Sequence, residues 1–266
     1  ALSNSGLPVE AKLALAPRVL PVEKIVDLMH EAEDCGPLTL TNPPANGWAL
    51  DDSIVITGQL AEQGARQRLL ESVKDVAGDR EVLVDAEILN ANLCKIEQAL
   101  PRAASLGFAV NFGFGDRADP NPAGRYFVGE NPVIDVVIPA DVTDGYLWVF
   151  IVDVTGSVFH LLPNLNRPDN SVADLRKGKT GAVPVRVAYG MGEAKGNSKM
   201  AFVVDDSVLG KSKIVVLHAA APVFESLRPI SESTSSFAGA LTREETGADL
   251  VDTFSIDSRV LTTEAK

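Results

Sequence analysis

Histidine and cysteine, which often carry proton-transfer and metal chemistry, are scarce in this sequence. Its 266 residues include three histidines (His30, His160 and His218) and two cysteines. A Ser-His-Asp triad needs a histidine as proton carrier, and no Gly-x-Ser-x-Gly motif accompanies these three. The phosphate-binding Gly-x-x-x-x-Gly-Lys-Ser/Thr loop and the zinc-binding His-Glu-x-x-His pair are also missing. The sequence therefore predicts no catalytic residue, no metal site and no cofactor.

Excess positive charge and long apolar runs are lacking as well. The formal net charge is −12, and its field repels nucleic-acid phosphates and anionic lipids. No apolar run is long enough to cross a bilayer, and the first residues lack the order of a signal peptide. We therefore expect a soluble region with no nucleic-acid partner, whose targeting or membrane-spanning segment was removed or lies outside it.

The composition is that of ordinary globular protein, with 45% apolar and 23% charged residues. The length suits two domains. We predict an αβ domain over residues 1–104, a β-sandwich domain over 105–230, and a C-terminal tail over 231–266 that docks as a strand. The expected fold class is therefore α+β.

Hydrophobic periodicity organises the first domain. Apolar residues recur at helical spacing in three segments and alternate or cluster as in strands in two others. The predicted order is α-β-α-β-α: a helix beginning at Pro21, a strand over Ser53–Gly58, a helix over 62–77 ended by Gly78, a strand over Glu81–Ile88, and a helix with Leu93 and Leu100 ended by Pro101. Cys35 and Cys94 bracket the β-α-β centre. From the residues alone, buried free thiols and a disulfide both remain open.

The second domain shows short alternating or apolar runs separated by turn residues, which is typical of a sandwich or barrel. Eight strands are predicted: 107–112, 125–128, 133–138, 145–154, 157–162, 182–188, 200–204 and 213–218. The turn sequence Asp153-Val-Thr-Gly156 predicts a hairpin between the fourth and fifth of them.

The segment from Ile54 to Asn90 resembles one repeat of the BON family, small αβ modules of bacterial periplasmic and outer-membrane proteins. Its flanking cysteines resemble a variant found outside the membrane in bacterial serine/threonine kinases, where the equivalent cysteines are paired. The resemblance, and the lack of a competing cysteine, imply a Cys35–Cys94 disulfide. Such a bond requires an oxidising compartment.

A second resemblance follows in Gly145-Tyr-Leu-Trp-Val-Phe150, Asp153, Gly156 and Leu161-Leu-Pro-Asn164. These residues are similar to the motifs of an uncharacterised bacterial β-sandwich family found after caspase-like proteases or serine/threonine kinase modules. The chain itself lacks the His-Arg-Asp and Asp-Phe-Gly motifs of a kinase domain.

Candidate binding residues come from one strand and the loop that follows its hairpin. Tyr146, Trp148 and Phe150 share one face of the predicted strand and suggest an aromatic platform, although packing between the two sheets explains the same pattern. The loop from Pro163 to Gly178 is long for a compact sandwich. Its polar residues Asn164, Arg167 and Asp169 are predicted to contact a ligand or partner, and a solvent-facing connection is the alternative.

Both resemblances imply a periplasmic region attached to a membrane span outside this sequence. We expect a non-catalytic sensory or scaffold region of a membrane-anchored signalling protein, a serine/threonine kinase, that binds a small ligand or an envelope protein. One alternative is a structural envelope or secretion component. The other is a hydrolase that uses paired acidic residues.

Overall fold

The computed structural model describes residues 19–100, 103–195, 199–245 and 254–266. Helices hold 23% and strands 37% of the chain, so the fold is β-rich α+β, which confirms the predicted class at this level. The chain forms two compact units, Ala1–Ile88 (unit 1) and Leu89–Lys266 (unit 2). Among the described residues, no helix is long and apolar enough to cross a membrane.

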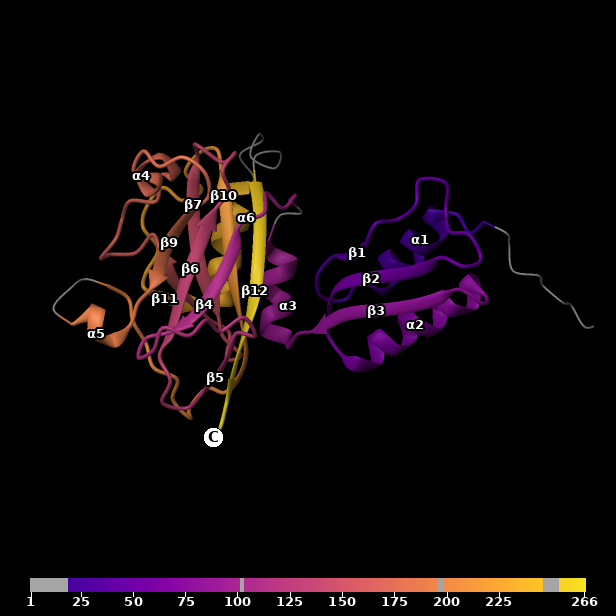
Figure 1. Ribbon diagram of the computed structural model, residues 1–266, viewed down its shortest axis with the longest axis horizontal. Helices are drawn as coiled ribbons and strands as arrows, with labels where there is room; N and C mark the ends of the chain where they lie inside the picture. Colours follow the sequence, from indigo (N-terminus) through magenta and orange to yellow (C-terminus); the bar gives the residue numbers. More distant parts are fainter. Residues whose placement is uncertain (1–18, 101–102, 196–198, 246–253) are drawn as a thin grey trace, which may run out of the picture. The chain divides into compact units, whose positions relative to one another are not determined.

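Unit 1 is a three-stranded sheet with two helices on one face (Figure 1). Its elements are α1 (Val22–Ala32), β1 (Leu38–Leu40), β2 (Ser53–Leu60), α2 (Gln63–Ala77) and β3 (Glu81–Ile88). The strand order is β1-β2-β3, and α2 connects the parallel pair β2 and β3. The alternation of β3 turns Val84 and Ala86 toward the helices, so these side chains are buried. The helices and strands predicted from periodicity are confirmed here.

Gly78 ends α2, as its sequence position predicts. Its φ is +64°, and its backbone N–H donates to Lys74 O at 3.2 Å. A residue with a side chain would be strained in this conformation. The chain can therefore turn directly from α2 into β3.

Unit 2 contains two sheets that share one apolar core. The larger sheet has the order β11-β8-β7-β10-β12-β5 and the smaller one β4-β6-β9. The strands are β4 (Ala109–Phe114), β5 (Arg125–Phe127), β6 (Pro132–Ile138), β7 (Tyr146–Val152), β8 (Ser157–Leu162), β9 (Val183–Ala188), β10 (Gly210–Ala219), β11 (Ser231–Ser233) and β12 (Phe254–Glu264). Short helices α4 (Val172–Arg176) and α5 (Met191–Ala194) flank β9 in sequence. β7 and β8 form the predicted hairpin.

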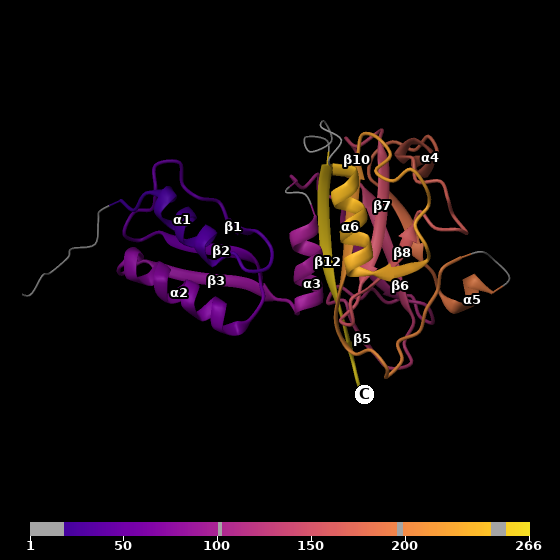
Figure 2. The same ribbon diagram turned by 180° about the vertical axis from the view of Figure 1, so that it is seen from behind.

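Two longer helices, α3 (Ala91–Ala99) and α6 (Thr234–Glu245), pack against each other in unit 2. Both lie on the side of the large sheet away from β4, β6 and β9 (Figures 1 and 2). Lys213 of β10 forms a nearly buried ion pair with Glu97 of α3. The first domain predicted from the sequence, residues 1–104, includes this helix. In the structure α3 belongs to unit 2, because it packs on α6 and its Glu97 pairs with Lys213.

The predicted tail over 231–266 contributes β11, α6 and β12. β12 pairs along ten residues with β10 and runs parallel to β5 on its other side. It is therefore an interior strand of the large sheet rather than an appended tail.

One predicted strand, 200–204, is wrong. This segment joins neighbouring loops at its two ends, through Tyr189 N to Met200 O (2.9 Å) at one end and through Gly129 N to Val204 O (2.8 Å) and Val204 N to Glu130 O (2.9 Å) at the other. Because its partners are loop residues, no continuous ladder forms.

Cys35 and Cys94 are bonded to each other, which confirms the predicted disulfide. The bond closes a loop of about 60 residues, and a constraint of this length is worth about 4 kcal/mol in the chain-entropy model.

Candidate functional site

The three predicted aromatic residues share one face of β7, but this face does not point between the two sheets. Leu147, Val149 and Ile151 fill the core between the sheets. Tyr146, Trp148 and Phe150 point to the opposite side, where α6 lies (Figure 2). The three aromatic side chains therefore do not pack between the two sheets, and Phe150 packs instead against Phe237 of α6.

Burial differs among these aromatic side chains. Phe150 is fully buried and its ring centroid lies 4.6 Å from that of Phe237 on α6. Trp148 is 4% exposed and contacts Phe224 edge to face at 6.2 Å. Tyr146 is partly exposed and lies 6.3 Å from Trp148. Only Tyr146 offers substantial surface to a partner.

Tyr146 and Trp148 line a pocket of about 250 Å³, which we call the Tyr146 pocket. Its walls are aromatic rings, prolines and a few polar side chains from β7, β8, the loop after β8 and the segment before β11: Tyr146, Trp148, His160, Pro163, Pro168, Asn170, Pro222, Phe224, Glu225, Ser226, Leu227 and Arg228. The loop beginning at Pro163 thus contributes to this pocket.

The predicted polar residues of that loop have other positions. Asn164 is buried, and its Oδ1 accepts hydrogen bonds from the backbone N–H groups of Asn166 (2.9 Å) and Arg167 (3.0 Å). Arg167 donates from Nη1 to Arg186 O at 2.8 Å, and Asp169 is exposed. None of the three lines the Tyr146 pocket. The sequence predicted that the loop from Pro163 to Gly178 contributes to a binding site. The loop residues that line the pocket are Pro163, Pro168 and Asn170.

A charged cluster adjoins the Tyr146 pocket, because two of its members, His160 and Arg228, line the pocket. His160 Nε2 is 3.0 Å from Glu232 Oε1, and Arg228 contacts both oxygens of Glu232 at 2.9 and 2.5 Å. Ser236 Oγ donates to Glu232 Oε2 at 2.6 Å. Three donors therefore converge on one carboxylate, and we call these four residues the Glu232 cluster.

Burial sets the protonation of this cluster. Burial lowers the pKa of His160 and outweighs the opposing attraction of Glu232. Burial also raises the pKa of Glu232, but the hydrogen bonds from Arg228, Ser236 and His160 together lower it below its ordinary value. Near neutral pH, a neutral His160 thus donates its Nε2–H to an ionised Glu232.

A larger hollow lies elsewhere in unit 2 and has a volume of about 610 Å³. We call it the Arg117 groove. It is formed by β4, β6, β9, β12 and the loop after β4, and its walls hold three arginines, two aspartates and two phenylalanines: Asn111, Phe112, Gly113, Phe114, Arg117, Ala118, Asp119, Pro120, Pro122, Val133, Asp135, Arg186 and Arg259.

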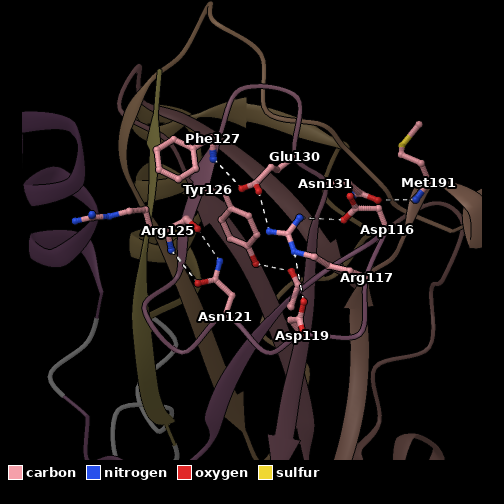
Figure 3. A network of polar contacts seen from close by, with 11 residues as sticks. Asp116, Arg117, Asp119, Asn121, Arg125, Tyr126, Phe127, Glu130, Asn131 and Met191 are labelled. Atoms are coloured by element: carbon pink, nitrogen blue, oxygen red, sulfur yellow. Dashed lines mark hydrogen bonds and ion pairs between the residues drawn. The ribbon is translucent and has the colours of Figure 1, made fainter. Parts of the chain in front are cut away.

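Arg117 occupies the loop between β4 and β5, and Figure 3 shows its guanidinium among three carboxylates. Nη2 is 2.8 Å from Glu130, Nη1 is 3.4 Å from Asp116, and Nε is 3.9 Å from Asp119. The guanidinium also lies 3.3 Å from the ring centroid of Phe114. The hydrogen bond to Glu130 is the main cause of the raised pKa of Arg117, so its charge is permanent.

The backbone beneath this loop is held by Asn131, which is buried. Its Oδ1 accepts from Met191 N at 2.6 Å, and its Nδ2 donates to Phe202 O at 2.7 Å (Figure 3). A Cβ at Gly115 would lie 1.9 Å from this Oδ1, so close packing requires glycine there. Gly115 N also donates to Asn131 O at 2.9 Å, so Asn131 ties the loop that carries Arg117 to the start of α5 and to the segment around Phe202.

The outer face of the small sheet forms the floor of the Arg117 groove. Asn111, Asp135 and Arg186 are cross-strand neighbours on β4, β6 and β9. Arg186 contacts Asp135 through two parallel contacts of 3.0 Å each. The hydrogen bond to Asp135 is also the main reason that the pKa of Arg186 is raised.

Sequence reasoning missed the Arg117 groove. Its polar side chains come from β4, the following loop, β6, β9 and β12, and no spacing in the sequence relates them. Among residues 19–100, 103–195, 199–245 and 254–266, no group of three or more His, Cys, Asp or Glu side chains is placed to hold a metal ion.

The chain matches no protein-family model and no curated protein.

Proposed function

We propose that this chain is a non-catalytic recognition region of a membrane-anchored bacterial signalling protein, and that it captures a partner protein on the periplasmic side of the membrane. The disulfide supports an oxidising location, because such bonds persist outside the cytosol. The BON-like layout of unit 1 and the kinase-associated sandwich family of unit 2 belong to the proposal. They rest on the motifs quoted from the sequence.

The single observation that carries the proposal is the composition and size of the Tyr146 pocket. Pockets for small molecules usually span roughly 300–1,000 Å³, and this one is about 250 Å³. Its aromatic and proline walls suit an apolar side chain, and interfaces often concentrate their binding energy where such a side chain fills a pocket. We therefore infer that it receives one anchoring side chain of a protein partner.

The polar groups of the pocket support capture of a partner rather than turnover. Arg228 is held by Glu232, and Asn170 donates from Nδ2 to Leu147 O at 3.1 Å. These groups are fixed before a partner arrives, so binding requires little ordering of the pocket.

Site-specific photocrosslinking tests this proposal. A photoreactive residue replaces Leu227, which lines the pocket and is 40% exposed. After irradiation in intact bacterial envelopes, we expect a discrete crosslinked protein that Tyr146→Ala greatly reduces. Tyr146→Ala should leave the fold intact because this side chain is partly exposed.

The matched control places the same photoreactive residue at Leu106, which is 42% exposed and lies outside the pocket. No corresponding product is expected there. Equal labelling from both positions, or no product from position 227, would contradict the proposed partner site.

A further inference from the structure

The Arg117 groove is a second candidate site, separate from the Tyr146 pocket and independent of the function proposed for it. Its volume of about 610 Å³ lies within the range of roughly 300–1,000 Å³ that small ligands occupy. The two sites share no lining residue. The groove therefore suits a ligand of its own.

The floor of the groove presents hydrogen-bond donors beside acceptors. The Asn111 side chain is exposed and makes no hydrogen bond within the described part of the chain. It can offer both a carbonyl oxygen and an NH₂ group. Next to it, Asp135 and Arg186 form a planar pair whose orientation is fixed by two contacts of 3.0 Å. A hydroxyl group, which donates and accepts at once, matches such a surface.

The rim of the groove combines polar and apolar surface. Asp119 is largely exposed, with 78% of its side-chain area accessible, and lies 3.9 Å from Arg117. Pro120 and Pro122 are exposed at the same rim. The rim thus adds a free carboxylate oxygen for hydroxyl groups and apolar surface for C–H groups.

Charge distinguishes among ligand classes. Carboxylates outnumber guanidinium groups in and around the groove. Asp116, Asp119 and Glu130 surround Arg117, and Asp135 and Glu193 pair with Arg186. Arg259 donates instead to the backbone carbonyl oxygens of Val110 and Pro122. Because three guanidinium groups stand against five carboxylates, the net negative charge of the groove repels an anion. A cation would compete with arginines that already hold the carboxylates.

We propose that the Arg117 groove binds a neutral oligosaccharide. Its ring hydroxyls would bond Asn111, Asp119 and the Asp135–Arg186 pair, and its C–H faces would rest on Pro120 and Pro122. This is a saccharide site distinct from the partner-protein pocket, so either can exist without the other.

A glycan array probed with the whole chain tests the proposal, followed by calorimetric titration of the neutral glycans that bind. Sulfated glycans on the same array and inorganic phosphate in solution serve as anionic probes. We expect neutral glycans to bind and both anionic probes to fail. Asn111→Ala should weaken binding about fivefold, as expected for one lost hydrogen bond. Asn111→Ala combined with Asp119→Ala should weaken it more than about tenfold.

The matched control is Asn166→Ala, an exposed asparagine outside the groove. The affinity of this variant for the neutral glycans should equal that of the parent chain. The proposal is overturned if no neutral glycan binds, if sulfated glycans or phosphate bind instead, or if Asn111→Ala and Asn166→Ala have the same affinity as the parent. Crosslinking at the Tyr146 pocket is measured separately and does not depend on these results.

Discussion

Glu232 and Glu130 of unit 2 each pair with an arginine, and their surroundings differ. Glu232 is 5% exposed at its side chain and also binds His160 and Ser236, and the His160 ring packs against Phe150 and Phe237. Glu130 is 17% exposed at the rim of the Arg117 groove, where it binds Arg117 and the backbone N–H of Phe127. The same type of ion pair, between glutamate and arginine, therefore has two roles. The covered pair holds elements together, and the open pair positions a guanidinium beside a groove.

The electrostatics of the two glutamates agree in direction. Burial raises the pKa of each carboxyl, and hydrogen bonds from the arginine and other donors outweigh this effect and lower the pKa. The two glutamates differ in how much stability is lost when the carboxylate is removed. At Glu130, water can replace it. At Glu232, His160 would remain buried without its acceptor, which is costly.

The largest effect is expected for Glu232→Gln. This change removes one charge from a buried pair and leaves donors facing the amide, so unit 2 should lose about 3 kcal/mol of unfolding free energy. Urea unfolding followed by tryptophan fluorescence of Trp148 measures it. A loss below about 1 kcal/mol would show that the cluster behaves like a surface ion pair, and the comparison would fail.

A smaller, pH-dependent effect is expected from His160. Its pKa is lowered in the folded state, so the unfolded chain takes up a proton at higher pH than the folded chain. This contribution to stability is complete above about pH 6.5, the ordinary histidine value, and is lost as pH falls toward the folded pKa. Urea unfolding between pH 7.5 and 5 should show falling stability in the parent and a flatter profile in His160→Gln.

The control for this pH dependence is His30→Gln, at an exposed position of α1. It should retain the parent slope. A profile for His160→Gln that falls as steeply as the parent profile would assign the acid sensitivity to other groups.

The smallest effect is expected for Glu130→Gln, which matches the substitution at Glu232. Because its pair with Arg117 is open to water and salt, the loss of stability should be about a quarter or less of that at Glu232. The same urea unfolding measurement compares them. Equal losses would mean that the lower exposure of Glu232 does not distinguish the two networks.

Local sequence patterns predicted most elements of unit 1. β3 has the bounds Glu81–Ile88 that its alternation indicates, and α2 ends at Gly78. The β7–β8 hairpin was predictable for the same reason. Asp153 Oδ1 accepts from the N–H groups of Thr155 and Ser157 at 2.9 Å each, and Gly156 adopts a φ of +86°. These features depend on neighbours within a few residues.

The unit to which α3 belongs and the position of β12 in the large sheet depend on residues far away in the sequence. Periodicity identified the helix around Leu93, but its unit depends on α6 and Lys213, more than 100 residues later. The tail was expected to dock as a strand, yet only pairing with β10 and β5 places it inside the sheet. The Arg117 groove has the same origin, since Asn111, Asp135 and Arg186 meet only when β4, β6 and β9 pair.

The sequence by itself determined the helices and strands of unit 1, the hairpin of unit 2 and the acidic charge, because these follow from local spacing and composition. Its two cysteines also left a single pairing possible. The tertiary structure alone decided which face of β7 is covered by α6, where β12 lies and which polar side chains surround the Arg117 groove. The physical reason is that strand pairing and side-chain burial join segments far apart in the chain, and no local pattern encodes which distant segment will supply the partner.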